Sequence, residues 1–149
     1  MPLIPPPLLV ALFGVTMWQL AEHLPLGGFA FAAQRPLAGL LLLAGLALLA
    51  AAAWTMFRAR TTINPLTPER ASHLVTSGVF AVSRNPIYLG DALILAALAL
   101  GFGNAVNFLL LPLFVWLIGR VQIAPEERAL ERLFGEEYRA YCARVRRWL

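Results

Sequence analysis

The sequence predicts an all-α integral membrane protein, a helical bundle of about four transmembrane helices with a C-terminal amphipathic interfacial helix. The first reason is composition: 60% of the 149 residues are hydrophobic and 13% are charged, whereas soluble domains carry about 25% charged residues. The second is size, because a chain this short has too much surface to hide so much apolar material from water. The third is that the apolar residues form long uncharged runs. We expect one domain over residues 1–149.

Two apolar segments open the chain, at about residues 3–21 and at 37–57. The first has no charge before Glu22 and is about long enough to span the hydrocarbon core. Its prolines 5–7 suit a helix entry, where missing N–H groups cost little. We interpret it as a retained helix and not as a cleaved signal peptide, because no basic region precedes it. The second segment is a run of Leu and Ala that ends at Arg58.

Residues 58–86 are expected to form a cytosolic loop that contributes to function. The segment is rich in Thr, Ser, Pro, Asn and Gly, which favour turns and helix caps. A connection this long in a small protein is usually functional or disordered, and its embedded apolar residues argue against disorder. After it, residues 87–123 have the pattern of a helical hairpin, broken by the turn at 101–104 and with Pro112 in its second arm.

The C-terminal segment 125–148 is expected to be an amphipathic helix lying along the membrane interface. Its apolar residues recur with a mean spacing close to that of an α-helix, and arginines and glutamates fill the other faces. They are Leu130, Phe134, Tyr138, Tyr141, Val145 and Trp148.

Charge and cysteine content narrow the function classes. All twelve basic residues are arginines, and eleven of them lie within 58–84 and 120–147, beside apolar segments. This placement is typical of the cytoplasmic face of a membrane protein, so we expect no nucleic-acid partner. The one cysteine, Cys142, permits no internal disulfide. His23 and His73 are too far apart in sequence for a zinc motif, and we expect no metal site.

One polar constellation stands between the loop and the hairpin, at residues 83–90. Pro86 disfavours helical geometry at Asn85, so Arg84 and Asn85 are expected to face outward from the helix start. Tyr88 and Gly90 follow in the first turn, and the free N–H groups there favour a carboxylate or phosphate. The alternative is a structural one, in which these residues are a membrane anchor, a turn and an interfacial tyrosine.

A second constellation, Glu126-Glu127-Arg128, directly follows Pro125. Acidic residues in a first turn complement the helix dipole, so simple capping is one explanation. Paired carboxylates at a membrane surface could instead hold an amine, a ribose diol or a sulfonium cation.

Other acidic residues fit structural roles or stay open. We expect Glu136 and Glu137 to be surface residues that pair with arginines of the same helix. Asp91 lies one turn inside an apolar segment. Buried there, it would be costly and functional; near the interface, it would only respond to the helix dipole.

Both constellations resemble segments of one enzyme family. Isoprenylcysteine carboxyl methyltransferases and related phospholipid methyltransferases carry an Arg-His-Pro-x-Tyr-x-Gly motif, which is similar to the segment from Arg84 to Gly90. Their C-terminal segment resembles the stretch from Glu126 to Tyr141 with the same internal spacing. The resemblance covers residues 60–148, and its two motifs occur in order on either side of the hairpin. Asn85 departs from the pattern, because the family has His at that position.

The resemblance implies an integral membrane enzyme that transfers a methyl group from S-adenosyl-L-methionine to a lipophilic acceptor. The acceptor would be an isoprenylcysteine-like carboxylate or a lipid headgroup that enters from the bilayer, so membrane lipids are expected partners. The cofactor site would face the cytoplasm, with the protein in the inner membrane of a bacterium. By position, its cofactor-binding residues would be Arg84, Asn85, Tyr88, Gly90, Glu126 and Glu127, and its catalytic residues Glu127 and Arg128.

Two other functions remain open on the sequence. One is a membrane reductase of the sterol-reductase type, which would use NADPH. The other is a non-enzymatic membrane subunit, with Asn85 marking a site that has lost activity. Oligomeric state is also open, because small residues such as Gly45 could pack helices within the chain or between chains.

Overall fold

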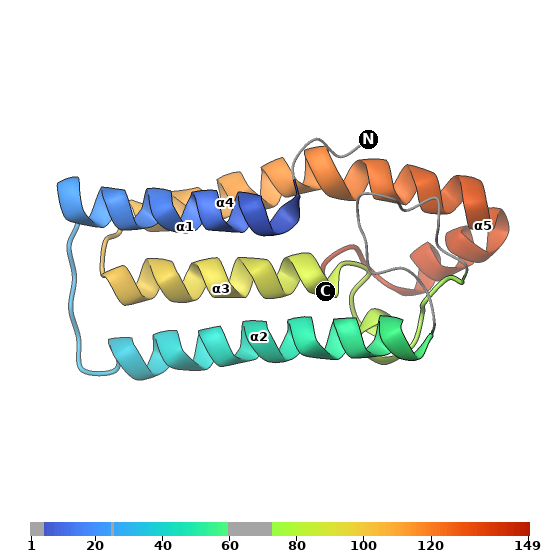
Figure 1. Ribbon diagram of the computed structural model, residues 1–149, viewed down its shortest axis with the longest axis horizontal. Coiled ribbons are helices and arrows are strands. Elements are labelled where there is room, and N and C mark those ends of the chain that lie inside the picture. Colours follow the sequence, from blue (N-terminus) through green and yellow to red (C-terminus); the bar gives the residue numbers. More distant parts are fainter. Residues whose placement is uncertain (1–4, 25, 60–72) are drawn as a thin grey trace.

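The computed structural model describes residues 5–24, 26–59 and 73–149, and these residues are almost entirely helical. Within them the only β-type pairing is an isolated bridge between Gly28 and Asn104. The elements, drawn in Figure 1, are α1 (Pro6–His23), α2 (Gln34–Arg58), the 3-10 turn η2 (Gly78–Ala81), α3 (Pro86–Phe102), α4 (Asn107–Ile118), the π-helical turn η3 (Gly119–Ile123) and α5 (Ala124–Arg144).

Helix α3 is the centre of the bundle. It lies between α2 on one side and α1 and α4 on the other (Figure 1). Gly45 of α2 faces Gly90 of α3, and a Cβ added at Gly90 would lie 3.0 Å from the Gly45 carbonyl oxygen. The two backbones can approach this closely because neither residue has a side chain. The small-residue contact open on the sequence is thus formed within the chain.

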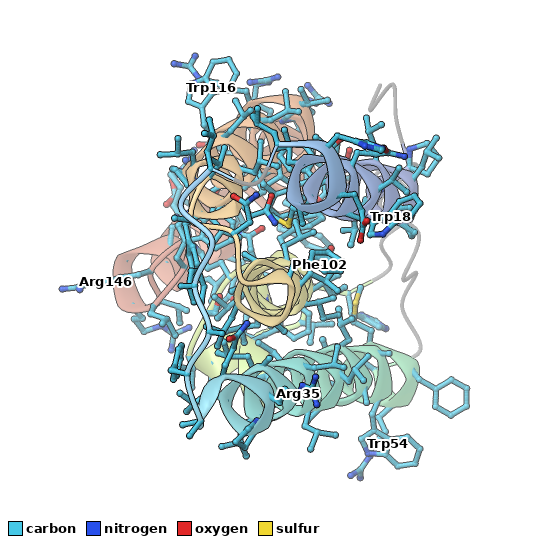
Figure 2. All side chains as sticks on the ribbon, turned by 90° about the vertical axis from the view of Figure 1, so that its left-hand side faces the viewer. Trp18, Arg35, Trp54, Phe102, Trp116 and Arg146 are labelled. Carbon is cyan, nitrogen blue, oxygen red and sulfur yellow. The ribbon has the colours of Figure 1, made fainter. Side chains whose placement is uncertain are left out.

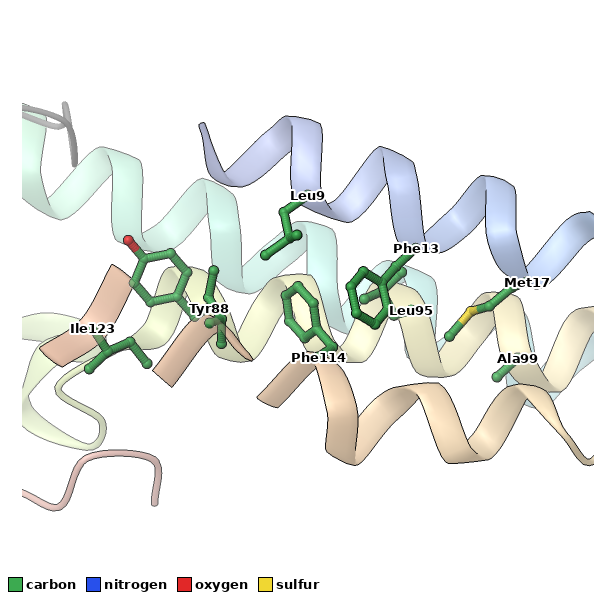
Figure 3. Close-up of a cluster of buried hydrophobic side chains, with 9 residues drawn as sticks. Leu9, Phe13, Met17, Tyr88, Leu95, Ala99, Phe114 and Ile123 are labelled. Atoms are coloured by element: carbon green, nitrogen blue, oxygen red, sulfur yellow. The ribbon is translucent and has the colours of Figure 1, made fainter. Parts of the chain in front are cut away.

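A buried apolar cluster joins α3 to α1, α4 and η3 on the other side (Figure 3). Phe13 and Phe114 meet edge to face in it, with ring centroids 5.4 Å apart, a geometry that aromatic rings prefer. The cluster ends at Tyr88, near the first turn of α3. Its members are Leu9, Phe13, Met17, Tyr88, Leu95, Ala99, Phe114, Ile118 and Ile123.

Side-chain amides close the opposite end of the bundle. Asn104, in the turn between α3 and α4, donates hydrogen bonds to the carbonyls of Leu20 and Leu24 at 3.2 and 2.8 Å. Gln34, at the start of α2, donates to the Leu100 carbonyl at 2.8 Å. The last carbonyls of a helix have no partner within it, so these amides satisfy the ends of α1 and α3 and fix the two connections together.

Two described helices are long and apolar enough to cross a membrane: α2, and the continuous helix formed by α4, η3 and α5. Helix α3 is apolar but shorter, with 17 residues or about 26 Å, against about 30 Å for a hydrocarbon core. The expected set of four spans is therefore confirmed only in part. Large apolar side chains nevertheless cover the outside, and Trp18, Trp54 and Trp116 point away from the bundle (Figure 2).

The helices otherwise lie close to their expected positions. The segment expected at 37–57 is a helix from Gln34 to Arg58, and the hairpin expected at 87–123 turns between Phe102 and Asn107. The expected start of the first helix at residue 3 lies outside the described residues, as does most of the expected loop 58–86.

The C-terminal part differs from the expectation of one interfacial helix over 125–148. Pro125 does not separate it from α4, because the π-helical turn places the Ala124 N–H on the Gly119 carbonyl, five residues back. Gly135 then interrupts α5 with φ 47° and ψ −116°, a conformation that glycine adopts readily. The helix ends at Arg144, and Val145 is extended. The expected interfacial helix is therefore not confirmed.

Candidate active site

Three segments meet where α3 begins: the first turns of α3, the first turns of α5 and the C-terminal residues 145–148. The end of the chain lies beside the start of α3 in Figure 1. The N–H of Arg84 donates to the Arg146 carbonyl at 3.1 Å, so the chain end runs directly past the motif at 83–90. The two constellations of the sequence are thereby brought to one end of the bundle.

Tyr88 and Glu126 form the inner contact of this site. The Tyr88 hydroxyl donates to Glu126 Oε1 at 2.6 Å, and the Gln122 amide donates to the same oxygen at 3.0 Å. Tyr88 is 4% exposed and Gln122 is 1% exposed. Two donors on one oxygen favour the ionised form of a partly buried carboxyl group, so Glu126 presents negative charge inside the protein end of the site.

Glu127 forms the outer contact and is shared by two arginines. Arg147 holds it in a two-pronged arrangement, with Nε 3.0 Å from Oε1 and a second nitrogen on Oε2. Arg84 approaches from the other side, 3.5 Å from Oε1. Hydrogen bonding to the Glu127 carboxylate raises the pKa of Arg147 above its usual value. This network ties α5 to both the α3 motif and the chain end.

Arg84 has unused hydrogen-bonding capacity. Its terminal nitrogen donates to the sulfur of Cys142, and its guanidinium pairs with Glu127. Its Nε is buried, however, and has no hydrogen-bond partner in the described part of the chain. A buried, unpaired donor is costly, so this N–H is a position at which an anionic or carbonyl group of a ligand would be stabilised.

Asn85 acts as a bracket between α3 and the chain end. Its N–H donates to the Ser83 hydroxyl at 3.1 Å, its side-chain amide donates to the Arg147 carbonyl at 2.9 Å, and its carbonyl accepts the Leu89 N–H at 3.0 Å. The side chain is thus already engaged within the protein. These contacts support a structural task for Asn85 at the position where the resembled family has His.

The remaining residues expected at the site lie elsewhere. Gly90 packs against Gly45 of α2. Arg128 is exposed, and among the described residues no hydrogen bond or ion pair to it is found. Glu136 is on the surface and pairs with Arg139 at 2.6 Å, as expected, and Glu137 is exposed.

Three members of the network were not expected from the sequence: Gln122, Cys142 and Arg147. Arg147 was one of many arginines assigned to a positive membrane face, and its two-pronged pairing depends on how the chain returns after Arg144. Gln122 gave one usable signal, since it is a polar residue within an otherwise apolar run, one helical turn before Glu126.

Comparison with known proteins identifies the family of this site. The family model described as Phospholipid methyltransferase matches residues 33–137. An uncharacterized protein of Haemophilus influenzae is 48% identical over 63 residues, which are 42% of this chain and 100% of that protein. No solved structure matches the chain significantly.

Two relatives with named activities match shorter parts of their own length. The protein-S-isoprenylcysteine O-methyltransferase of Schizosaccharomyces pombe is 35% identical over 72 residues, covering 48% of this chain and 30% of that protein. Protein-S-isoprenylcysteine O-methyltransferase B of Arabidopsis thaliana is 29% identical over 91 residues, covering 61% of this chain and 46% of that protein. The chain thus spans less than half the length of either. Because the family model covers most of the chain and includes Arg84, Tyr88, Glu126 and Glu127, this protein belongs to the phospholipid methyltransferase family.

Proposed function

We propose that the protein is a membrane methyltransferase that uses S-adenosyl-L-methionine to methylate a lipophilic acceptor at the cytosolic face of the membrane. One observation carries the proposal. Two motifs separated by the whole α3–α4 hairpin meet through the Tyr88–Glu126 hydrogen bond and the Arg84–Glu127 ion pair. A purely structural helix cap would not require a buried polar network between two such distant segments.

The chemistry of these residues fits the cofactor. S-adenosyl-L-methionine combines a cationic sulfonium and amine with a carboxylate and ribose hydroxyls, and it supplies an activated methyl group. Glu126 and Glu127 are acceptors suited to its cationic and hydroxyl groups, while the buried Nε of Arg84 lacks a partner in the described residues and suits the carboxylate. We therefore assign Arg84, Tyr88, Glu126 and Glu127 to the cofactor site.

The protein's task in this reaction is alignment. Methyl transfer requires the nucleophile, the methyl carbon and the leaving sulfur to lie in line, and positioning of this kind supplies much of the rate. Tyr88 and Gln122 hold Glu126 in one orientation, and Arg84 and Arg147 hold Glu127. Held carboxylates stabilise positive charge without reorganising during the reaction. Asn85 contributes by fixing the chain end that carries Arg147.

The membrane setting explains how a lipophilic acceptor would reach this end of the bundle. The outward faces of α1, α2 and α4 are apolar, as a surface covered by lipid requires. We propose that all four of α1 to α4 cross or enter the bilayer, with the site and the arginine-rich segments on the cytoplasmic side of a bacterial inner membrane. An acceptor dissolved in the bilayer would then approach laterally, beside the first turns of α3.

Calorimetric binding to the purified protein in detergent tests the cofactor assignment. We expect saturable binding of S-adenosyl-L-methionine and S-adenosyl-L-homocysteine and no binding of NADPH. Binding of NADPH alone would favour the reductase. Failure of all three ligands to bind, repeated in nanodiscs of native lipid, would favour the non-enzymatic subunit. Transfer of a labelled methyl group to a membrane-lipid extract then tests the enzyme activity itself.

A further inference from the structure

We propose that Asp91 receives the proton released by the acceptor, which makes the site selective for a lipophilic amine over a carboxylate. This inference rests on the methyltransferase function proposed above. It concerns a residue outside both the Tyr88–Glu126 and the Arg84–Glu127 contacts, and it chooses between acceptor classes that the sequence left open.

Asp91 lies on the inward face of α3, at a short distance from the proposed cofactor site. It follows Tyr88 by three residues and precedes Leu95 by four, so all three share one face of the helix. Tyr88, Asp91 and Leu95 are 4%, 8% and 0% exposed. The carboxyl group is therefore about 4.5 Å further along the helix axis than Tyr88, on the side of the bilayer interior.

The carboxylate of Asp91 has no compensating partner among the described residues, which show no hydrogen bond or ion pair to it. The arginines at this end do not serve it, because Arg84 and Arg147 are both engaged by Glu127. The Tyr88 hydroxyl donates to Glu126 instead. An ionisable side chain in an apolar segment is expensive, and where it occurs it usually serves a function.

The group is also reachable. The sealed polar atoms without a partner in the described residues are Arg84 Nε and Asn107 Oδ1. The oxygens of Asp91 are not among them, so they retain accessible surface. Asp91 thus combines an unpaired charge, nine-tenths burial of the residue and an open approach to its oxygens, next to Tyr88. These are the properties of a group that waits for a ligand.

The proton balance of methyl transfer defines what this group can do. When a neutral amine attacks the methyl group of a sulfonium donor, an N–C bond forms, the C–S bond breaks and its electron pair stays on sulfur. The amine becomes an ammonium and must release one proton. The Asp91 carboxylate can accept that proton, become a neutral carboxylic acid and return the proton to water at the interface.

A carboxylate acceptor fits this position poorly. It carries no proton to release, so it needs no base. It is also an anion, and two unpaired carboxylates close together in a medium of low dielectric constant repel strongly. An ammonium or amine is attracted to the same charge. Asp91 thus separates the two acceptor classes by the sign of their charge.

The test compares the wild type with Asp91→Asn, which removes the charge with little change of shape. Glu137→Gln, on the exposed surface, is a control with the same change in net charge. In nanodiscs with labelled methyl donor we measure methylation of dodecylamine and of dodecanoate, two probes with chains of the same length. Binding of dodecyltrimethylammonium, a cation that cannot be methylated further, and of S-adenosyl-L-homocysteine is measured separately.

We expect the wild type to methylate the amine in preference to the carboxylate. Asp91→Asn should slow amine methylation by about 10²-fold and weaken binding of the ammonium probe, while S-adenosyl-L-homocysteine binding and the Glu137→Gln control stay unchanged. Preference of the wild type for dodecanoate, or equal ammonium binding by the wild type and Asp91→Asn, would overturn the inference. Asp91-dependent ammonium binding without any cofactor binding would instead sink the proposed function and leave Asp91 as a cation site.

Discussion

The side-chain amide of Asn85 donates a hydrogen bond to the backbone carbonyl of Arg147, 2.9 Å away. Through this contact the first turn of α3 holds the residue that clamps Glu127 from the other side. A position that carries His in the resembled motif is therefore occupied by an amide whose hydrogen atoms serve the protein's own chain end. The proposed function then depends on Asn85 through the position of Arg147.

Replacing Asn85 tests this dependence. Asn85→Ala leaves the Arg147 carbonyl without its donor, and we expect a loss of about 1–3 kcal/mol in stability together with weaker binding of S-adenosyl-L-homocysteine. Asn85→His keeps a donor and should restore part of the binding. Thermal unfolding in detergent and calorimetry measure the two effects. Wild-type binding by Asn85→Ala would show that the bracket does not act on the cofactor site.

The Arg84–Glu127 pair provides the most direct test of the cofactor site. We expect Arg84→Ala and Glu127→Gln each to weaken S-adenosyl-L-methionine binding at least tenfold, which is about 1.4 kcal/mol, while the detergent-solubilised protein stays folded. Removing a charge from a held pair leaves the partner's charge without compensation. Calorimetry checks the affinity and size-exclusion chromatography checks the fold.

Arg128→Ala is the matched control, because Arg128 is exposed at the next position along α5. We expect it to bind the cofactor as the wild type does. Unchanged affinity in both Arg84→Ala and Glu127→Gln would remove these residues from the cofactor site.

Most of the helix positions could be predicted from the sequence, because long apolar runs and their polar ends are local signals. The continuity of α4 with α5 could not. Pro125 is normally evidence for a helix start, and only the preceding π-helical turn allows the helix to pass through it. The break at Gly135 was equally hidden, since a glycine within a periodic pattern indicates a left-handed residue only when the chain must turn there.

The candidate site shows the same division. Its Arg84, Tyr88, Glu126 and Glu127 could be predicted because they lie in two ordered motifs. The pairing of Arg147 with Glu127 depends on where the chain goes after α5 ends, which no local pattern specifies. The burial of Asp91 likewise follows from which face of α3 meets α1 and α4, and an apolar run on all sides of a helix does not define that face.

The contact between α2 and α3 predicts a steric effect at Gly90. A Cβ there would lie 3.0 Å from the Gly45 carbonyl oxygen and 3.0 Å from Leu49 Cγ, so Gly90→Val would force the helices apart. We expect a loss of about 1–3 kcal/mol in stability, measured as a lower thermal transition in detergent. Gly39→Val in α2 is the control, because a Cβ at Gly39 meets nothing within 4 Å. Equal transitions in the two variants would contradict the close approach.

Cys142 predicts a graded response to substitution. Its sulfur accepts a hydrogen bond from Arg84, so Cys142→Ser keeps an acceptor and should bind the cofactor as the wild type does. Cys142→Val has a similar volume but no acceptor. It would leave a second nitrogen of Arg84 unpaired beside the orphaned Nε, and we expect S-adenosyl-L-homocysteine binding to weaken several-fold, for about 1 kcal/mol. Calorimetry of both variants measures the difference. A loss in Cys142→Ser as large as in Cys142→Val would show that the thiol itself, and not its acceptor capacity, matters at this site.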